Sequence, residues 1–376
     1  MNFNLYFKSR QGEMISFLKE LVRIESPTSD KKAVDACSAY MIEKFKKIGV
    51  KITRAPQKKI GDFTIIEYPS KEDKRLEDQI LILTHIDTVW PVGKIEKMPF
   101  YVQGEKVFGP GVLDMKAGLV LSYFALKTLS DLNIRPLKKI ALFINTAEET
   151  GSNEAHEIIK RLAKKSACVL CLEPALPGGG LKVQRKGRLV IRFQAQGKAA
   201  HSGNAESGVN AIDELMAQLR KIRMLKSKDV AVNIGLIGGG EKANIVPEHA
   251  WAVLDVRFWN MVQKEKIIAC LKRLEPSLKG AKIKFSMESV TPPMEKTPAS
   301  ARLLLEVGKI AAGLGITLAT GKAGGGSDAS IASGLGIATL DGLGPDGAGI
   351  HARNEHLLLP SLAQRAALLT ELLRQL

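Results

Sequence analysis

Two adjacent carboxylates, Glu148 and Glu149, follow an apolar run and precede a turn glycine, Gly151. The run, residues 139–145, has no polar alternation, which predicts a strand buried on both faces, as in a parallel sheet. Ligands of such sheets bind outside the carboxyl ends of the strands. Because neighbouring side chains point in different directions there, one carboxylate can bind a cation while the other faces a substrate. A solvated acidic turn is the alternative for this stretch alone.

Two other apolar strands also end in polar residues. Residues 79–87 end with His85 and Asp87. Since positions i and i+2 of a strand share a face, Asp87 is expected to hydrogen-bond to the His85 ring and orient it. The predicted strand 169–172 ends at Glu173. Three buried strands are therefore expected to bring side chains that can bind metal or transfer protons to one edge of the predicted sheet.

Two loops carry further candidates. The Gly/Pro-rich loop 109–114 ends at Asp114, directly before a predicted helix, 115–129. A helix N-terminus favours an anionic side chain. His351 lies in a loop that follows the predicted strand 337–340.

These side chains form a donor set for two divalent cations. An imidazole and carboxylate oxygens around each cation suit zinc, with cobalt or manganese as substitutes. Two ions ~3.5–4 Å apart need a carboxylate that touches both. Two divalent ions against three carboxylates leave one positive charge, which favours a bridging hydroxide as the nucleophile. Glu148, left without a metal, would take its proton and pass it to the leaving nitrogen. The candidate ligands are His85, Asp114, Glu149, Glu173 and His351.

Composition narrows the class of protein. The chain has 376 residues, enough for two domains, and its 45% hydrophobic and 25% charged residues are typical of soluble globular proteins. No apolar run approaches the ~20 residues that span a bilayer, and the first 30 residues lack a signal peptide's apolar core, so we expect a cytoplasmic protein that binds no membrane. The four cysteines are too scattered for a disulfide framework. Cys168 and Cys171 lie in a predicted buried strand and are interpreted as core residues.

The formal net charge of +16 is compatible with nucleic-acid binding. The basic residues are spread along the chain, however, and only 5% of the residues are aromatic. Few side chains can therefore stack on bases. We interpret the charge as a solvated basic surface and expect no nucleic-acid partner.

The second half of the chain changes in pattern. Between residues 185 and 292 the predicted elements follow the order β-α-β-β-α-β, the ferredoxin-like unit. We therefore predict an α/β protein: a mixed, mostly parallel sheet flanked by helices, residues 1–184 and 293–376, with an inserted ferredoxin-like α+β domain, residues 185–292. The glycine loops 238–240 and 324–328 lack a following Lys-Ser/Thr or helix-opening motif and are interpreted as tight turns.

The motifs, taken in order, resemble the di-zinc aminoacylase/carboxypeptidase family, which includes glutamate carboxypeptidases, acetylornithine deacetylase, succinyl-diaminopimelate desuccinylase and related dipeptidases. The resembling segments are 84–87, 109–116, 147–151 and 173–174. The resemblance implies a di-zinc exopeptidase-like fold and a cis peptide bond after Asp114. It also implies two ligand groups, one of His85, Asp114 and Glu173 and one of Asp114, Glu149 and His351.

The inserted domain resembles the family's lid and dimerisation domain. Segment 197–203 is similar to the one whose histidine, here His201, stabilises the tetrahedral oxyanion, often in the neighbouring subunit's site. Asn244 and Arg257 match substrate-contacting positions, and Gly325 lies in a loop that could hold a carboxylate. Without the resemblance, Asn244 would be a turn residue and Arg257 a surface residue. Segment 290–295 lacks the arginine with which folate-cleaving carboxypeptidases grip a terminal carboxylate, which puts a preference for C-terminal glutamate in doubt.

The sequence thus predicts a two-metal amidohydrolase or exopeptidase, similar to glutamate carboxypeptidase, that cleaves an amide beside a free carboxylate. The expected substrate is a small peptide or an N-acyl-amino acid, and the expected assembly is a homodimer formed through the lid. The alternatives are an N-acyl-amino-acid deacylase, a dipeptidase, or a non-catalytic basic binding protein of the same fold. The unligated Glu148 argues against the last, because a binding protein has no need of it.

Overall fold

The structure, a computed structural model, describes residues 2–71 and 79–376. The chain folds into two compact units. The first comprises Met1–Val183, Lys296–Lys322 and Ser327–Leu376, and the second comprises Gln184–Glu295 and Ala323–Gly326.

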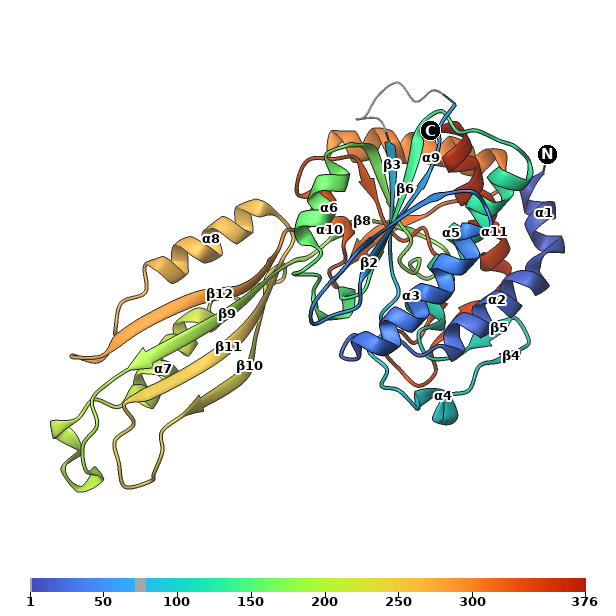
Figure 1. Cartoon of the computed structure of the whole chain (residues 1–376). Helices are drawn as coiled ribbons and strands as arrows, with labels where there is room; N and C mark the ends of the chain where they lie inside the picture. Colours follow the sequence, from blue (N-terminus) through green and yellow to red (C-terminus); the bar gives the residue numbers. More distant parts are fainter. Residues whose placement is uncertain (1, 72–78) are drawn as a thin grey trace. The chain divides into compact units, whose positions relative to one another are not determined.

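A six-stranded sheet forms the centre of the first unit (Figure 1). Its strand order is β1-β2-β6-β3-β7-β14. Neighbours among β6, β3, β7 and β14 are parallel, whereas β1 pairs antiparallel with β2 and β2 with β6. Every residue of β3 is buried, as its unbroken apolar run predicts. The strands are β1 (Lys51–Ala55), β2 (Phe63–Tyr68), β3 (Gln79–His85), β6 (Lys139–Asn145), β7 (Ser166–Cys171) and β14 (Thr339–Leu340).

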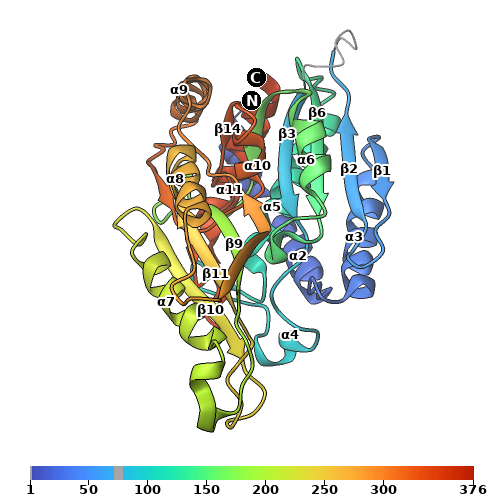
Figure 2. The ribbon, with the colours of Figure 1, turned by 90° about the vertical axis from the view of Figure 1, so that its left-hand side faces the viewer.

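Helices pack on this sheet (Figures 1 and 2). Helix α5 packs against β3, and α6 and α10 pack against β7. The buried apolar side chains of the sheet and of α5 belong to one core, which also includes α2 and α11. The helices are α1 (Phe3–Ser9), α2 (Gln11–Arg23), α3 (Lys31–Lys46), α4 (Lys94–Lys97), α5 (Ala117–Asp131), α6 (His156–Ala163), α9 (Pro298–Gly313), α10 (Ala329–Ser333) and α11 (Leu359–Gln375).

Outside the second unit's own sheet, the remaining strands of the described structure form two small sheets. One has the strand order β15-β16-β5-β4, and the other consists of β13 paired with β8. Their strands are β4 (Tyr101–Gln103), β5 (Lys106–Phe108), β15 (Gly347–Ala348), β16 (His356–Leu358), β8 (Leu181–Arg185) and β13 (Thr320–Ala323).

The second unit is a four-stranded antiparallel sheet with two helices, in the predicted β-α-β-β-α-β order. Its strand order, β10-β11-β9-β12, is that of the ferredoxin-like unit. Buried residues alternate with half-buried or exposed ones along β9 and β11, so one face of the sheet packs on the helices. The elements are β9 (Gly187–Gln196), α7 (Ala211–Arg223), β10 (Ala231–Gly239), β11 (His249–Phe258), α8 (Met261–Lys272) and β12 (Lys282–Thr291).

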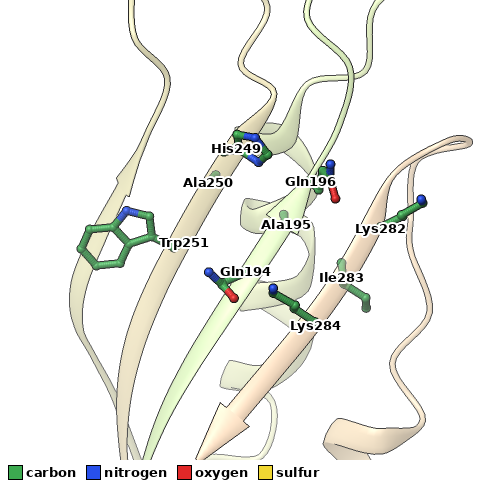
Figure 3. Close-up of a pocket in the computed structure, with 9 residues that line it drawn as sticks. All are labelled: Gln194, Ala195, Gln196, His249, Ala250, Trp251, Lys282, Ile283 and Lys284. Atoms are coloured by element: carbon green, nitrogen blue, oxygen red, sulfur yellow. The ribbon is translucent and has the colours of Figure 1, made fainter. Parts of the chain in front are cut away.

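The other face of this sheet carries a hollow of about 440 Å³ (Figure 3). His249 is one of its lining residues, together with Trp251 and Lys284. None of the lining residues is a predicted site residue, so the hollow lies outside the predicted site.

The structure differs from the sequence prediction at short or irregular elements. The helix predicted to begin at Met115 begins at Ala117, because Asp114 and Met115 have non-helical backbone angles and the peptide bond between them is cis. The cis bond agrees with the family resemblance. Helices α1 and α6 and the two- or three-residue strands β4, β5, β15 and β16 were not predicted, since such lengths show little periodicity. The two-residue strand β14 lies within the predicted strand 337–340.

The cysteine interpretation agrees with the structure, since Cys168 and Cys171 are both buried in β7. Within residues 2–71 and 79–376, no helix has both the length and the apolar character needed to cross a bilayer.

Candidate metal centre

Three adjacent parallel strands bring the predicted residues to one edge of the sheet. His85 is the last residue of β3 and pairs in register with Asn145 at the end of β6. Glu148 and Glu149 follow in a short 3-10 turn, and Glu173 follows β7, which pairs with β3 on its other side. Because carboxyl ends of neighbouring parallel strands lie side by side, residues far apart in sequence meet here.

His85 is buried with a mere 1% of its side chain exposed, and its Nε2 faces two carboxylates. Asp114 Oδ1 lies 3.2 Å from Nε2, and Glu173 Oε1 lies 3.6 Å from it. The three side chains thus converge on one point.

His351 forms a second convergence point that shares Asp114. Its Nε2 lies 3.3 Å from Asp114 Oδ2 and 3.0 Å from Glu149 Oε2. Asp114 therefore presents one oxygen to each imidazole. That is the arrangement a carboxylate needs to bridge two cations.

The donor spacing fits zinc. Ligand atoms bound tetrahedrally at 2.0–2.1 Å lie roughly 3.3 Å from one another, and the separations above run from 3.0 to 3.6 Å. Two other groups of donor atoms also lie within 4.8 Å of one another: His85 with Glu148 and Glu173, and His85 with Asp114 and Glu149. Glu148 is therefore close enough to act on the same centre.

Neighbouring carboxylates raise the pKa of both His85 and His351. Contacts with Asp114 and Glu149 hold the pKa of His351 at about 10. Burial acts to lower the pKa of His85, but Asp114 and Asp87 keep it well above its usual value. Clustered buried carboxylates require compensating cations. The raised pKa values favour protonated imidazoles, which would supply that charge when no metal is bound, and metal ions would replace their protons.

Glu148 and Glu149 differ in what surrounds them. Burial, and then the charge of Glu173, raise the pKa of Glu148 well above its usual value. Burial also raises the pKa of Glu149, but His351 opposes that shift. Of these two glutamates, Glu149 is the one with an ion-pair contact to a predicted imidazole ligand in the described structure, since its Oε2 lies 3.0 Å from His351 Nε2. A carboxyl group with a raised pKa is suited to exchanging a proton near neutral pH.

Asp87 has more contacts than the sequence analysis predicted. The His85 Nδ1 lies 3.0 Å from the main-chain oxygen of Asp87 and 3.4 Å from its carboxylate Oδ1. The carboxylate also accepts the Glu148 and Glu149 N–H groups at 3.2 Å and the Thr28 hydroxyl at 2.7 Å. Asp87 thus orients both the imidazole and the turn that carries the two glutamates.

Three buried residues near this turn were missed from sequence. Asp328 accepts hydrogen bonds from Ser152 Oγ at 2.5 Å and from Asn145 Nδ2 at 2.7 Å. The Asn145 oxygen in turn accepts the N–H groups of Thr146 and Ala147. The loop 324–328 was interpreted as a tight turn that could hold a carboxylate, with no role for Asp328. The one available signal was the Asp at the end of that glycine-rich loop.

Comparison with known proteins decides the family. The sequence profile of peptidase family M20/M25/M40 matches residues 81–375. The chain belongs to this family. Carboxypeptidase G2 of Pseudomonas sp. (strain RS-16) is 28% identical over 389 residues, which cover 99% of this chain and 92% of that protein. Succinyl-diaminopimelate desuccinylase of Corynebacterium glutamicum is 25% identical over 258 residues, 66% of each chain.

Solved structures of the M20 family share the fold. Aminopeptidase PepT from Bacillus cereus has a TM-score of 0.78 at 23% identity and covers 97% of this chain and 98% of its own. The metallo-carboxypeptidase Sso-CP2 from Sulfolobus solfataricus has a TM-score of 0.72 at 18% identity, covering 96% of this chain and 98% of its own. The predicted fold class and family resemblance are confirmed, and the chain is a hydrolase of the M20 metallopeptidases.

The remaining predicted M20 site residues lie in the second unit. His201 is exposed, and its Nδ1 accepts the Gly203 N–H at 3.1 Å. The main-chain oxygen of the exposed Asn244 accepts the N–H of Ser202, which follows His201. These contacts fix the loop around His201.

Arg257 and Gly325 already have partners within the second unit. Arg257 Nε donates to Asp255 Oδ1 at 2.7 Å. The main-chain oxygens of Gly325 and Gly326 accept hydrogen bonds from Arg185 Nη1 at 3.3 and 2.8 Å. Arg185 also pairs with Met294 through the main chain, so an arginine does lie beside segment 290–295, although not within it.

Proposed function

We propose that this M20 protein is a two-zinc carboxypeptidase-like enzyme that hydrolyses an amide next to a free carboxylate. The observation that carries the proposal is the position of Asp114, with one carboxylate oxygen toward His85 and the other toward His351. His85, Asp114 and Glu173 would hold one ion, and Asp114, Glu149 and His351 the other. Bound zinc would supply Lewis-acid polarisation of the amide carbonyl and a water of lowered pKa.

Glu148 would carry the protons of the reaction. It lies in the 3-10 turn next to Glu149, and the Asp87 carboxylate holds its N–H. It would accept a proton from the attacking water and deliver it to the leaving nitrogen, which needs that proton to depart as an amine.

The loop geometry supports His201 as a hydrogen-bond donor to the oxyanion. Because its Nδ1 accepts the Gly203 N–H, the neutral ring carries its proton on Nε2. The exposed ring thus presents an N–H to its surroundings while the main chain limits its rotation.

The substrate is proposed to be a small peptide or an N-acyl-amino acid. The relatives include carboxypeptidase G2 and a desuccinylase, while the structural neighbours include an aminopeptidase and a dipeptidase. Asn244, Arg257 and the loop of Gly325 are proposed to contact the substrate. The 28% identity to carboxypeptidase G2 favours a carboxypeptidase as first choice and an N-acyl-amino-acid deacylase or dipeptidase as second.

We further propose a cytoplasmic homodimer that assembles through the second unit, its lid domain. Strand β10 lies at an edge of that unit's sheet, and its Leu236 and Ile237 are each 59% exposed. An apolar edge strand is a ready pairing site for a second chain. Light scattering tests the dimer, and cell fractionation tests the location.

Removal of metal provides the test of the proposed activity. The protein as purified is expected to contain about two ions per chain by elemental analysis and to hydrolyse members of a panel of dipeptides, acyl-amino acids and peptides with free C-termini. A chelator should abolish hydrolysis, and zinc, cobalt or manganese should restore it. A fully metallated protein that cleaves none of these amides would favour the non-catalytic binding protein instead.

His201→Ala is expected to lower kcat by ~10²–10³-fold, because an oxyanion donor acts mainly in the transition state. KM, metal content and assembly mass should change little. If the donor comes from the partner chain, mixing His201→Ala with Glu148→Gln subunits should restore activity, since one hybrid site would carry both intact groups.

His249→Ala provides the matched control, because His249 is another exposed histidine of the second unit. It should leave kcat unchanged. Normal kcat with a raised KM in His201→Ala would make His201 a substrate-binding residue. Absence of recovery on mixing, with subunit exchange demonstrated, would place its action within its own chain.

A further inference from the structure

Glu355 is a buried carboxylate close in sequence to a proposed metal ligand. It lies four residues after His351 and directly before β16, and 1% of it is exposed. The proposed metal-binding and proton-transfer roles do not involve Glu355. A buried acidic side chain requires an explanation, because charged groups are rarely buried without partners.

Four N–H groups surround the Glu355 carboxylate. Oε1 accepts from the main-chain N–H of Leu113 at 2.9 Å and of Asp114 at 3.1 Å. Oε2 accepts from the main-chain N–H of Gly111 at 3.0 Å and from Trp90 Nε1 at 3.0 Å. A carboxylate has about four acceptor sites. All are used here, so Glu355 has no oxygen site left to serve as a metal ligand.

Three of these donors belong to the Asp114 loop, which we define as residues 109–116. The main chain of Glu355 holds the same loop, because its carbonyl oxygen accepts the Gly109 N–H at 3.4 Å. The next residue, His356, pairs with Phe108 just before the loop. Both the side chain and the main chain of Glu355 thus hydrogen-bond to the Asp114 loop.

The same residue also ends the turn that carries His351. Within that turn the N–H of Ala352 bonds to the oxygen of Gly349, and the N–H of Glu355 bonds to the oxygen of Ala352. His351 itself has a positive φ of 60°, so its side-chain direction depends on this turn. Glu355 therefore connects the backbone of the Asp114 loop with the backbone of the His351 turn.

We propose that Glu355 is a positioning residue that sets the distance between Asp114 and His351 and thereby the affinity of the metal pair. This inference rests on the proposed two-metal function. Asp114 would touch both ions, so a shift of its backbone would affect both sites. Partners that orient metal ligands without touching the metal typically contribute 10–100-fold to affinity.

Glu355→Gln tests the proposal at nearly constant volume. The glutamine oxygen can still accept two N–H groups, but its NH₂ group would face the other two donors. Metal-free protein would be titrated with Zn²⁺ against a competing chelator. We expect ~10–100-fold weaker binding of at least one ion, together with an altered visible absorption spectrum of the Co²⁺-loaded protein and an unchanged far-ultraviolet circular dichroism spectrum.

Glu214→Gln is the matched control. Glu214 is also fully buried, and its carboxylate also accepts main-chain N–H groups, from Ser277 at 3.0 Å and Leu278 at 2.7 Å. It lies in the second unit, which contains none of the proposed metal ligands. We expect this variant to lower the melting temperature of the metal-free protein while leaving Zn²⁺ affinity and the Co²⁺ spectrum unchanged.

The outcomes distinguish failure of the two-metal function from failure of the positioning role of Glu355. Wild-type protein that binds no pair of ions would refute the proposed function itself. Wild-type binding together with an unchanged affinity and Co²⁺ spectrum in Glu355→Gln would refute only the positioning role and leave Glu355 as a stabiliser of the fold.

If Glu355→Gln does not fold, Glu355→Asp provides a second variant that keeps the negative charge but has a side chain shorter by one methylene group. Weaker Zn²⁺ binding by Glu355→Asp would support the proposal, and unchanged binding would overturn it.

Discussion

Glu148→Gln is expected to keep both metal ions and the fold but to lose hydrolysis by ~10²–10⁴-fold or more. The amide has nearly the shape of the carboxylate and can still occupy the turn whose N–H group bonds to Asp87. It cannot accept a proton from water or return one to the leaving nitrogen. Because the same group is proposed to act first as base and then as acid, both proton transfers are lost. Elemental analysis and kcat on the best substrate of the panel measure the effect.

The neighbouring glutamate provides the control for this prediction. Glu149→Gln alters the residue that contacts His351 and should lose metal as well as activity. If Glu148→Gln instead loses an ion, the alternative grouping of Glu148 with His85 and Glu173 is correct. Near-normal turnover in a fully metallated Glu148→Gln protein would refute the proton-transfer role.

Asp114→Ala is expected to lose more bound metal than any other single ligand substitution. Asp114 is the one member of the proposed ligand set that contacts both imidazoles through separate oxygens in the described structure. Its removal takes a donor from each site and also removes the anion that contacts both imidazoles. We expect little metal in the variant after dialysis and no measurable hydrolysis.

His351→Ala is the comparison for this prediction. His351 is 48% exposed and serves only the second proposed ion. Its loss should weaken one site and leave the site of His85 and Glu173 largely intact. Equal metal loss from the two variants, measured as ions per chain, would contradict a bridging role for Asp114.

The sequence revealed the parts of the fold that depend on periodicity and on element ends. Strands β3 and β6 are continuous apolar runs, and the structure has them as parallel central strands. Strand β3 ends with His85, and the turn that carries Glu148 and Glu149 follows shortly after β6, so both placements show a local sequence pattern. The β-α-β-β-α-β order predicted between residues 185 and 292 likewise matches the order of elements in the second unit.

Other features of the centre have no local pattern. Glu355 and Asp114 are 241 positions apart along the chain, and their contact is a side-chain bond to a main-chain N–H group. Asp328 and Asn145 are 183 positions apart. A main-chain N–H group is the same at every residue except proline, so sequence does not reveal which one a carboxylate will meet.

The sequence by itself determined which residue types could bind metal and transfer protons, because imidazoles and carboxylates were placed at the ends of buried strands. Only the tertiary structure decided how they are arranged: that Asp114 faces His85 with one oxygen and His351 with the other, and that Glu355 holds the Asp114 loop. The physical reason is that ligand chemistry belongs to single side chains, whereas distances between donors depend on packing and hydrogen bonds between segments remote in sequence.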